Sequence, residues 1–113
     1  MPRNMSFAMT TEQVKNRTKN VTRRFGWWFL KEGDVLWAVE KSMGLPKGGR
    51  VNRLAKIQVV SVLKEPLNEI TQQDVIKEGF PSWTPKDFVE FLVSHYKCDP
   101  TKDVNRIEFR YLP

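Results

Sequence analysis

The longest β-prone run in the chain, residues 54–63, constrains the fold more than any other feature. Polar and apolar residues alternate cleanly from Lys56 to Val59, and the alternation then slips at Val59-Val60. Because alternation reflects the two faces of a strand, this slip predicts a β-bulge or a strand that bends around a barrel. Pro66 ends the run, since proline cannot donate a ladder hydrogen bond.

Three shorter segments carry strand patterns, at residues 5–9, 35–40 and 106–112. In the last of these, Ile107 and Phe109 alternate with charged residues. We therefore expect a closing strand with one face packed inward and one face in water. The positions expected on the solvated face are Arg106, Glu108 and Arg110.

A helix is predicted over residues 72–78, with Thr71 as its N-cap and Gly79 directly after its end. This assignment places Glu78 in the last turn, where the helix dipole disfavours an anion by about 0.3–1 kcal/mol. A carboxylate at such a position is a small indication of function, although neighbouring Lys77 could offset the cost.

A second helix begins after Thr84, which is a favourable N-cap, with Pro85 at the first helical position and Asp87 in the first turn. Its apolar residues recur at the spacing of one helix face, which predicts a stripe that packs on the core. The members of this stripe are Phe88, Phe91, Leu92 and His95.

Three shorter segments complete the reading of the chain. A short helix is predicted over residues 11–16, with Thr10 as N-cap and Gln13 completing a capping box. Residues 31–34 are typical of a turn in which Gly33 adopts positive φ. Residues 44–50 are typical of a basic connecting loop, or of a loop that closes over an anion through its backbone amides.

These segments predict a single α+β domain spanning residues 1–113, with about five or six strands and two or three short helices. Strongly twisted strands and a bulge in so small a chain favour a partly closed β-barrel with the helices packed on it. An open α+β sheet is the alternative.

Composition restricts the class of partner. The chain has 19 Lys and Arg against 13 Asp and Glu, a net charge of +6, which favours an anionic partner such as nucleic acid or a nucleotide. A basic surface also serves solubility. With one cysteine, no apolar run of membrane-spanning length and no signal-peptide pattern, we expect a soluble cytoplasmic protein without a membrane partner.

Metal and histidine-based sites are not expected. His95 is the single histidine and Cys98 the single cysteine, and zinc takes four ligands or three plus water. A Cys98 nucleophile would need an activating base beside it, and none is evident. We therefore expect no metal, no cofactor, and a partly buried His95 on the second helix.

Residues 17–24 concentrate positive charge and hydroxyl groups. Arg17, Lys19, Arg23 and Arg24 fall within eight positions, and two tryptophans follow at once. A tight turn entering a strand could bring Lys19, Thr22 and Arg24 to one pocket, a set suited to a phosphate, a carbonyl or a base edge. A solvated basic loop, anchored by buried tryptophan, is the alternative.

The chemistry available to this stretch depends on Lys19, Thr22 and Glu78. A lysine whose pKa is depressed by burial or by neighbouring cations can help deprotonate a threonine hydroxyl, and a nearby glutamate can hold water or transfer a proton. The alternative is that Lys19 and Glu78 form a structural ion pair. Trp27, Trp28 and Phe29, which follow, cannot all face one side, so at least one ring should lie in the core and another at a surface or pocket rim.

The pattern Lys19-x-x-Thr22-x-Arg24 resembles the signature of ASCH domains, which are small PUA-like barrels. Residues 31–36 are similar to that family's turn into its next barrel strand, 76–80 to its Glu-Gly-Phe helix end, and 106–109 to its closing strand. The likeness covers residues 5–112.

This resemblance implies a PUA-type barrel with a cleft for RNA or a modified nucleoside, and a prokaryotic or phage source. The family includes small amidohydrolases that deacetylate N4-acetylcytidine. Carried over by position, Thr22 is the nucleophile, Lys19 its activator and Glu78 the acid or base. This sequence departs from the family pattern at Arg17, where the family usually has glycine. The tryptophan pair and the insertion at residues 44–50 are not general features of these amidohydrolases.

Three functions follow from the sequence. The first is binding of RNA or a nucleotide, with Arg17, Lys19, Arg23 and Arg24 on phosphate and Trp27 or Trp28 stacked on a base. The second is hydrolysis of an N-acylated nucleoside by Lys19, Thr22 and Glu78. The third is a protein-interaction domain without a small ligand.

Overall fold

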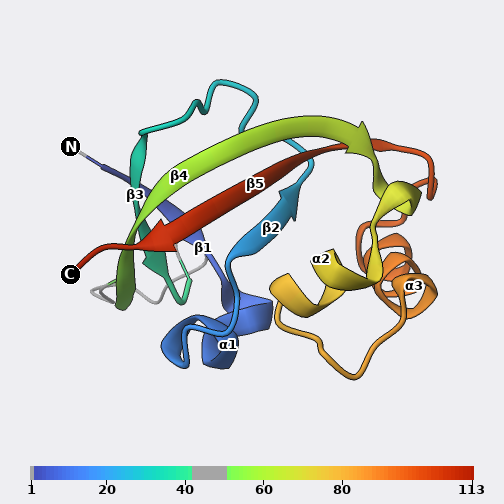
Figure 1. The fold of residues 1–113 in the computed structure, drawn as a ribbon, viewed down its shortest axis with the longest axis horizontal. Coiled ribbons are helices and arrows are strands. Elements are labelled where there is room, and N and C mark those ends of the chain that lie inside the picture. The colour runs from blue at the N-terminus through green and yellow to red at the C-terminus, as the bar shows by residue number, and fades with distance from the viewer. Residues whose placement is uncertain (1, 42–50) are drawn as a thin grey trace.

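The structure, a computed structural model, describes residues 2–41 and 51–113. The predicted loop at residues 44–50 lies outside the described residues. Five strands form one curled sheet in the order β1-β3-β4-β5-β2, with three short helices against it (Figure 1). The predicted α+β class and partly closed barrel are therefore confirmed as a half-barrel. The strands are β1 Arg3–Ser6, β2 Val21–Arg24, β3 Val35–Val39, β4 Arg53–Pro66 and β5 Asp103–Tyr111.

β4 is the strand around which the sheet bends. Its first half, residues 53–58, pairs antiparallel with β3, and residues 57–66 pair antiparallel with β5. The register with β5 shifts between Val59 and Ser61, which confirms the predicted bulge. Gly33 adopts a φ of 93°, as predicted for the turn before β3, and donates its backbone N–H to Val59 at 2.9 Å.

The helices are α1 Thr11–Lys15, α2 Gln72–Lys77 and α3 Pro85–Tyr96. Two of the three predicted caps are confirmed. The Thr71 hydroxyl accepts the backbone N–H of Asp74, and Thr84 and Asp87 form a reciprocal capping box. Short 3₁₀ turns precede α1 and α2, at Ala8–Thr10 and Leu67–Glu69.

The N-terminal predictions need two corrections. The first strand is Arg3–Ser6 rather than 5–9, because the backbone leaves the extended region at Phe7 and enters a 3₁₀ turn. The predicted capping box of Thr10 is absent, since its side chain makes no capping hydrogen bond. Gln13 reaches across the fold instead, and its amide donates to the backbone carbonyl of Gly79 at 3.5 Å.

The core consists of two clusters. One lies inside the curl of the sheet and contains Met5, Phe7, Leu36, Ile57 and Phe109, with Trp27 packed against it. The other lies between the helices and the far end of the sheet, and the residues at its centre are Leu67, Val75, Phe88, Leu92 and Val104. Within the described ranges, 2–41 and 51–113, no helix is both long enough and apolar enough to cross a membrane.

Candidate functional site

The site is built where the chain enters β2 beside the end of α2. Asn20 donates its backbone N–H to the carbonyl of Lys77 at 2.8 Å, which fixes the segment before β2 to the helix end. Gly79 follows with a φ of 101°, and an added Cβ there would lie 2.6 Å from Cγ of Gln13. A glycine at this position therefore lets α1, α2 and β2 approach one another closely.

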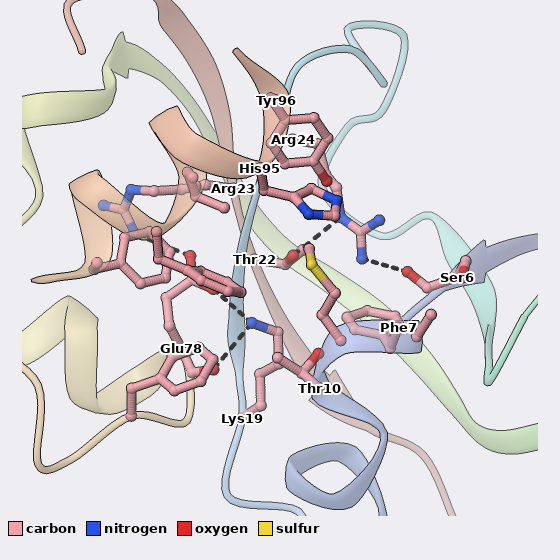
Figure 2. A pocket seen from close by; sticks show the side chains of 16 residues that line it. Ser6, Phe7, Thr10, Lys19, Thr22, Arg23, Arg24, Glu78, His95 and Tyr96 are labelled. Carbon is pink, nitrogen blue, oxygen red and sulfur yellow. Dashed lines mark hydrogen bonds and ion pairs between the residues drawn. The ribbon is translucent and has the colours of Figure 1, made fainter. Parts of the chain in front are cut away.

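Lys19 and Glu78 meet in the interior of this junction. Each residue is 2% exposed, and Lys19 Nζ lies 2.5 Å from Glu78 Oε1 and 3.0 Å from the Glu78 carbonyl oxygen. The predicted ion pair is therefore present, and both residues also line a cavity (Figure 2). Burial lowers the pKa of the Lys19 amine; Glu78 opposes this effect, while Arg24 and Arg23 add to it.

Thr22 and Arg24 lie two residues apart on β2 and therefore share a face of the strand. Arg24 Nε donates to Thr22 Oγ1 at 3.0 Å, and Arg24 Nη2 donates to the Ser6 carbonyl at 2.7 Å. The guanidinium also lies over the Phe7 ring, 4.7 Å from its centroid. Among the described residues Arg24 forms no ion pair, so its positive charge remains available to a ligand.

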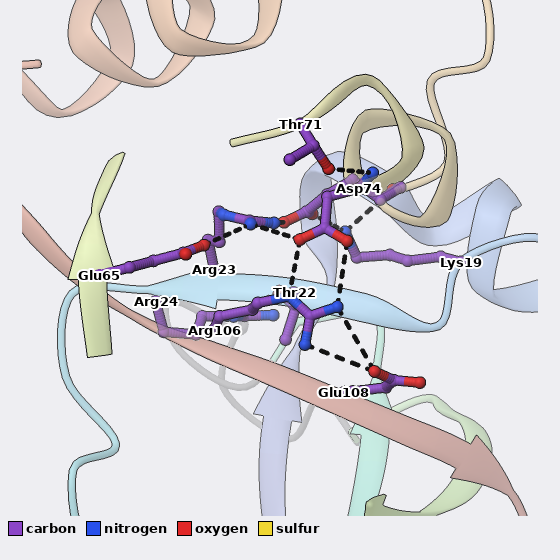
Figure 3. Close-up of polar contacts among 10 residues, drawn as sticks. Lys19, Thr22, Arg23, Arg24, Glu65, Thr71, Asp74, Arg106 and Glu108 are labelled. Carbon is purple, nitrogen blue, oxygen red and sulfur yellow. Dashed lines mark hydrogen bonds and ion pairs between the residues drawn. The ribbon is translucent and has the colours of Figure 1, made fainter. Parts of the chain in front are cut away.

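Arg23 points into a charged network behind β2 (Figure 3), which shares Glu78 with the site. Its guanidinium contacts Glu65 at 2.6 Å and Asp74 at 2.5 Å, and lies 3.4 Å from Glu78. Arg106 holds Asp74 from the other side, through Nε at 2.6 Å and Nη2 at 3.0 Å. These bonds, first from Arg106 and then from Arg23, hold the pKa of Asp74 at about 2.

The cavity beside β2 has a volume of about 250 Å³. Its polar lining comes from both ends of the junction: Lys19, Thr22, Arg23, Arg24 and Glu78. Its ring-bearing lining comes from the turn after β1, the segment after α2, and α3: Phe7, Phe80, Phe88, Phe91, His95 and Tyr96. Cationic and hydroxyl groups and aromatic rings thus line one half-open cavity (Figure 2).

The structure brings together five of the eight predicted site residues and leaves three outside this lining. Arg17 lies 5.2 Å from the centroid of the Tyr111 ring and adopts a φ of 57°. That left-handed conformation is one that glycine adopts without steric cost. Trp27 packs against the core, whereas Trp28 and Phe29 are exposed, which agrees with the prediction that these three rings divide between core and surface.

Sequence reasoning missed the contribution of α3 to the cavity. His95 was expected to be a partly buried stripe residue, but it is exposed at the end of α3 and lines the cavity with Tyr96, their rings 4.7 Å apart edge to face. The sequence signal was the i+7 spacing of His95 from Phe88, which puts His95 on the same helix face but at its far end, where that face meets the cavity.

The network around Asp74 was also missed. Arg106 was expected on a solvated face, yet it is partly buried, because Asp74 comes from α2 to cover that end of β5. Within residues 2–41 and 51–113, no cluster of three or more His, Cys, Asp or Glu side chains could hold a metal ion.

No family model matches this sequence, and no curated protein matches it. Solved structures, in contrast, match this chain in fold. An ASCH domain from Lactobacillus crispatus JV V101 superposes with a TM-score of 0.72, at 11% identity, over 96% of this chain and 78% of that one. The fold is ASCH-like.

Two further structures share this ASCH-like fold. Protein EF3133 from Enterococcus faecalis V583, of the family model DUF984, superposes with a TM-score of 0.70 at 16% identity, over 99% of this chain and 80% of that one. The hypothetical protein PH0355 superposes with a TM-score of 0.68 at 15% identity, over 99% and 100% of the two chains. At these identities the likeness concerns the fold alone, which matches the architecture predicted from the resemblance.

Proposed function

We propose that the protein binds a base, either of RNA or of a free modified nucleoside, in the cavity beside β2. The observation that carries this proposal is that Thr22 and Arg24 line the same half-open cavity as several aromatic rings. Proteins that recognise unpaired bases combine aromatic stacking with hydrogen bonds to the base edge. This cavity supplies both kinds of contact.

The polar groups suit a base edge, which carries donors and acceptors side by side. Arg24 offers N–H donors, the Thr22 hydroxyl can donate or accept, and the Glu78 carboxylate keeps acceptor capacity beyond its bonds to Lys19 and Arg23. A purely anionic ligand would bring a second negative charge beside this carboxylate and offer it no donor. A mixed edge therefore fits the set better than a phosphate alone.

Size and charge point the same way. The cavity volume of about 250 Å³ is slightly below the lower end of the range for ligand pockets, about 300 Å³. A cavity of this size suits one base or nucleoside. The net charge of +6 favours an anionic chain outside the cavity. A base inside and phosphates outside would satisfy both features.

Titration calorimetry with N4-acetylcytidine and cytidine tests this proposal. We expect saturable binding to the wild type and at least tenfold weaker binding to Thr22→Val and Arg24→Gln, because each loses one charge-assisted or hydroxyl contact. Arg110→Gln is the matched control, since Arg110 is exposed on β5 and bonds only Gln58 among the described residues. Equal affinities for all four proteins, or no binding to the wild type, would refute the proposal.

A second candidate is hydrolysis of an N-acylated nucleoside. The observation that favours it is the Arg24 bond to Thr22 Oγ1, which stabilises negative charge on that oxygen. The buried Lys19, whose pKa is lowered, lies in the same cavity and suits proton transfer. No hydrogen bond joins Thr22 to Lys19 or Glu78 within the described residues, so the proton would pass through a water or the substrate.

The reaction then divides into two balanced steps. Thr22 Oγ1 attacks the acyl carbon and gives up its proton, the C–N bond breaks, and the nucleoside leaves as an amine that takes up a proton. Water then attacks the acyl-threonine ester, which releases the carboxylic acid and restores the hydroxyl. Glu78 would orient that water or carry its proton.

The second candidate is tested by using chromatography to measure the release of cytidine from N4-acetylcytidine. Thr22→Ala and Lys19→Ala should each lose about 10²-fold or more in rate. Thr18→Ala is the control, because Thr18 is an exposed hydroxyl three residues before β2 that bonds the Gln13 carbonyl. A wild-type protein that binds the nucleoside without releasing product would leave binding as the function and remove hydrolysis.

A further inference from the structure

A second surface carries an exposed tryptophan together with two lysines. Trp28, Lys64, Lys102 and Asp103 line one shallow hollow. Trp28 belongs to the segment after β2, Lys64 lies near the end of β4, and Lys102 and Asp103 lie at the start of β5; Figure 1 shows these elements. Trp28 is 53% exposed, and the Lys64 side chain is 68% exposed. An aromatic face and two ammonium groups are thus presented to solvent together.

The backbone that carries Trp28 is held in place from the interior. The side-chain amide of Asn105, a residue 4% exposed, donates to the Trp27 carbonyl at 2.9 Å. Trp27 itself adopts a φ of 59° and packs against the core of the sheet. Because this anchor fixes the residue before Trp28, the exposed ring starts from an ordered backbone and loses less entropy when a ligand stacks on it.

The hollow connects to the cavity through Phe25. The Phe25 ring packs edge to face on Tyr96, which lines the cavity, with centroids 5.1 Å apart. Lys102, which lines the hollow, places its Nζ 5.1 Å from the Phe25 ring centroid on the other side of that link. One aromatic ring thus separates the lining of the cavity from the lining of the hollow.

We propose that Trp28, Lys64 and Lys102 bind the next part of a single-stranded nucleic acid whose base occupies the cavity. A neighbouring base stacks on Trp28, and the phosphates beside it contact the two ammonium groups. Single-strand binding sites combine these elements, stacking rings and a positively charged track. The inference rests on the proposed function, and it makes a strand, rather than a free nucleoside, the ligand that uses the whole surface.

Asp103 limits the charge of this surface. Its carboxylate lies 3.6 Å from Lys64 Nζ, and both side chains are about half exposed or more, so the pair contributes little to stability. A phosphate can therefore take over Lys64 at little cost, but it also meets the nearby carboxylate. Removal of that carboxylate should therefore raise the affinity for the strand, whereas removal of a contact residue should lower it.

The experiment compares a single-stranded RNA hexamer with the free nucleoside on the full chain. Trp28→Ala should weaken binding of the hexamer about 5- to 150-fold, the range for loss of one stacking ring, and leave binding of the nucleoside unchanged. Phe29→Ala is the matched control, because Phe29 is a neighbouring ring, 58% exposed, that lines neither the cavity nor the hollow. Circular dichroism confirms that each variant is folded.

Charge is tested through the salt dependence of hexamer binding. The double variant of Lys64→Gln and Lys102→Gln should lower the slope of log K against log salt by about 1.4, since each phosphate contact on a single strand contributes about 0.7. Asp103→Asn should tighten binding about two- to fivefold. Lys86→Gln, at a lysine side chain 83% exposed on α3, should change neither quantity.

The outcomes separate this inference from the proposed function. If the nucleoside and hexamer both bind but Trp28→Ala leaves the hexamer affinity unchanged, the second surface is refuted and the cavity stands. If Trp28→Ala weakens the nucleoside as much as the hexamer, the surface is also refuted, because its effect is then on the cavity. If neither ligand binds the wild type, both proposals fail.

Discussion

Asp74→Asn tests the energetic role of the charged network behind β2. Asp74 accepts three short bonds from Arg23 and Arg106, which hold its pKa at about 2 against an ordinary value of 3.8. A shift of this size corresponds to about 2 kcal/mol of folding free energy at neutral pH. Each arginine keeps a second carboxylate, Glu65 or Glu108, so the loss should stay below the 3–5 kcal/mol typical of an orphaned buried charge.

The pH dependence gives the prediction its sign. A carboxyl whose pKa is depressed in the folded state contributes stability that is complete above its unfolded pKa and is lost as pH falls through its folded pKa. The contribution of Asp74 should therefore be complete above about pH 5, fall to roughly half at pH 3 and nearly vanish at pH 2. The asparagine variant lacks this component altogether.

Urea unfolding of the wild type and Asp74→Asn at pH 7 and pH 3 measures the effect. We expect a difference in unfolding free energy of about 2 kcal/mol at pH 7 and about half of that at pH 3. Asp87→Asn is the matched control, because Asp87 also occupies the third helical position after a threonine N-cap but forms no ion pair among the described residues. Equal losses for the two variants at pH 7, or a difference for Asp74→Asn that does not change with pH, would refute the reasoning.

Three further predictions concern residues outside the cavity lining. Gly79→Ala should destabilise the protein by at least about 1 kcal/mol more than Gly33→Ala in thermal unfolding, because both have positive φ but only the Gly79 methyl would clash with Gln13. Arg17→Gly should leave nucleoside affinity within twofold of the wild type, since Arg17 lies outside the cavity lining; a tenfold loss would show a missed contact. Burial raises the pKa of Tyr111 to about 12, so the free energy of unfolding should fall as pH rises from 10 to 12. Tyr111→Phe should remove that part of the fall, and it should also remove the ionisation seen near pH 12 by ultraviolet titration.

Local patterns were sufficient where the structure depends on neighbours in sequence. The slip at Val59-Val60 predicted the bulge of β4, and the caps at Thr71 and Thr84 predicted the starts of α2 and α3. Each of these features is decided within a few residues, by side-chain alternation or by a hydroxyl that accepts a nearby N–H.

The cavity could be predicted in part. Alternation along β2 puts Thr22 and Arg24 on one face, so their meeting follows from the sequence. Glu78 is 59 residues from Lys19. Its position at a helix end only hinted at function, and its role beside Lys19 and Thr22 was assigned by the resemblance to ASCH domains.

The remaining contacts depend on tertiary packing. Arg106 alternates with apolar residues as a solvated arginine would, and only the position of α2 over β5 reveals that Asp74 partly covers it. His95 belongs to the predicted stripe of α3, but α3 extends past the core, so its last turn faces the cavity instead. Periodicity identifies the face of a helix and not what that face meets.

The most direct test of the central claim is a backbone amide NMR titration of the ¹⁵N-labelled protein with N4-acetylcytidine. If a base binds beside β2, the shifts should concentrate at residues 19–24, at Glu78 and at residues 95–96, which enclose the cavity from three sides. Shifts confined to other parts of the chain, or no shifts at millimolar nucleoside, would contradict the account.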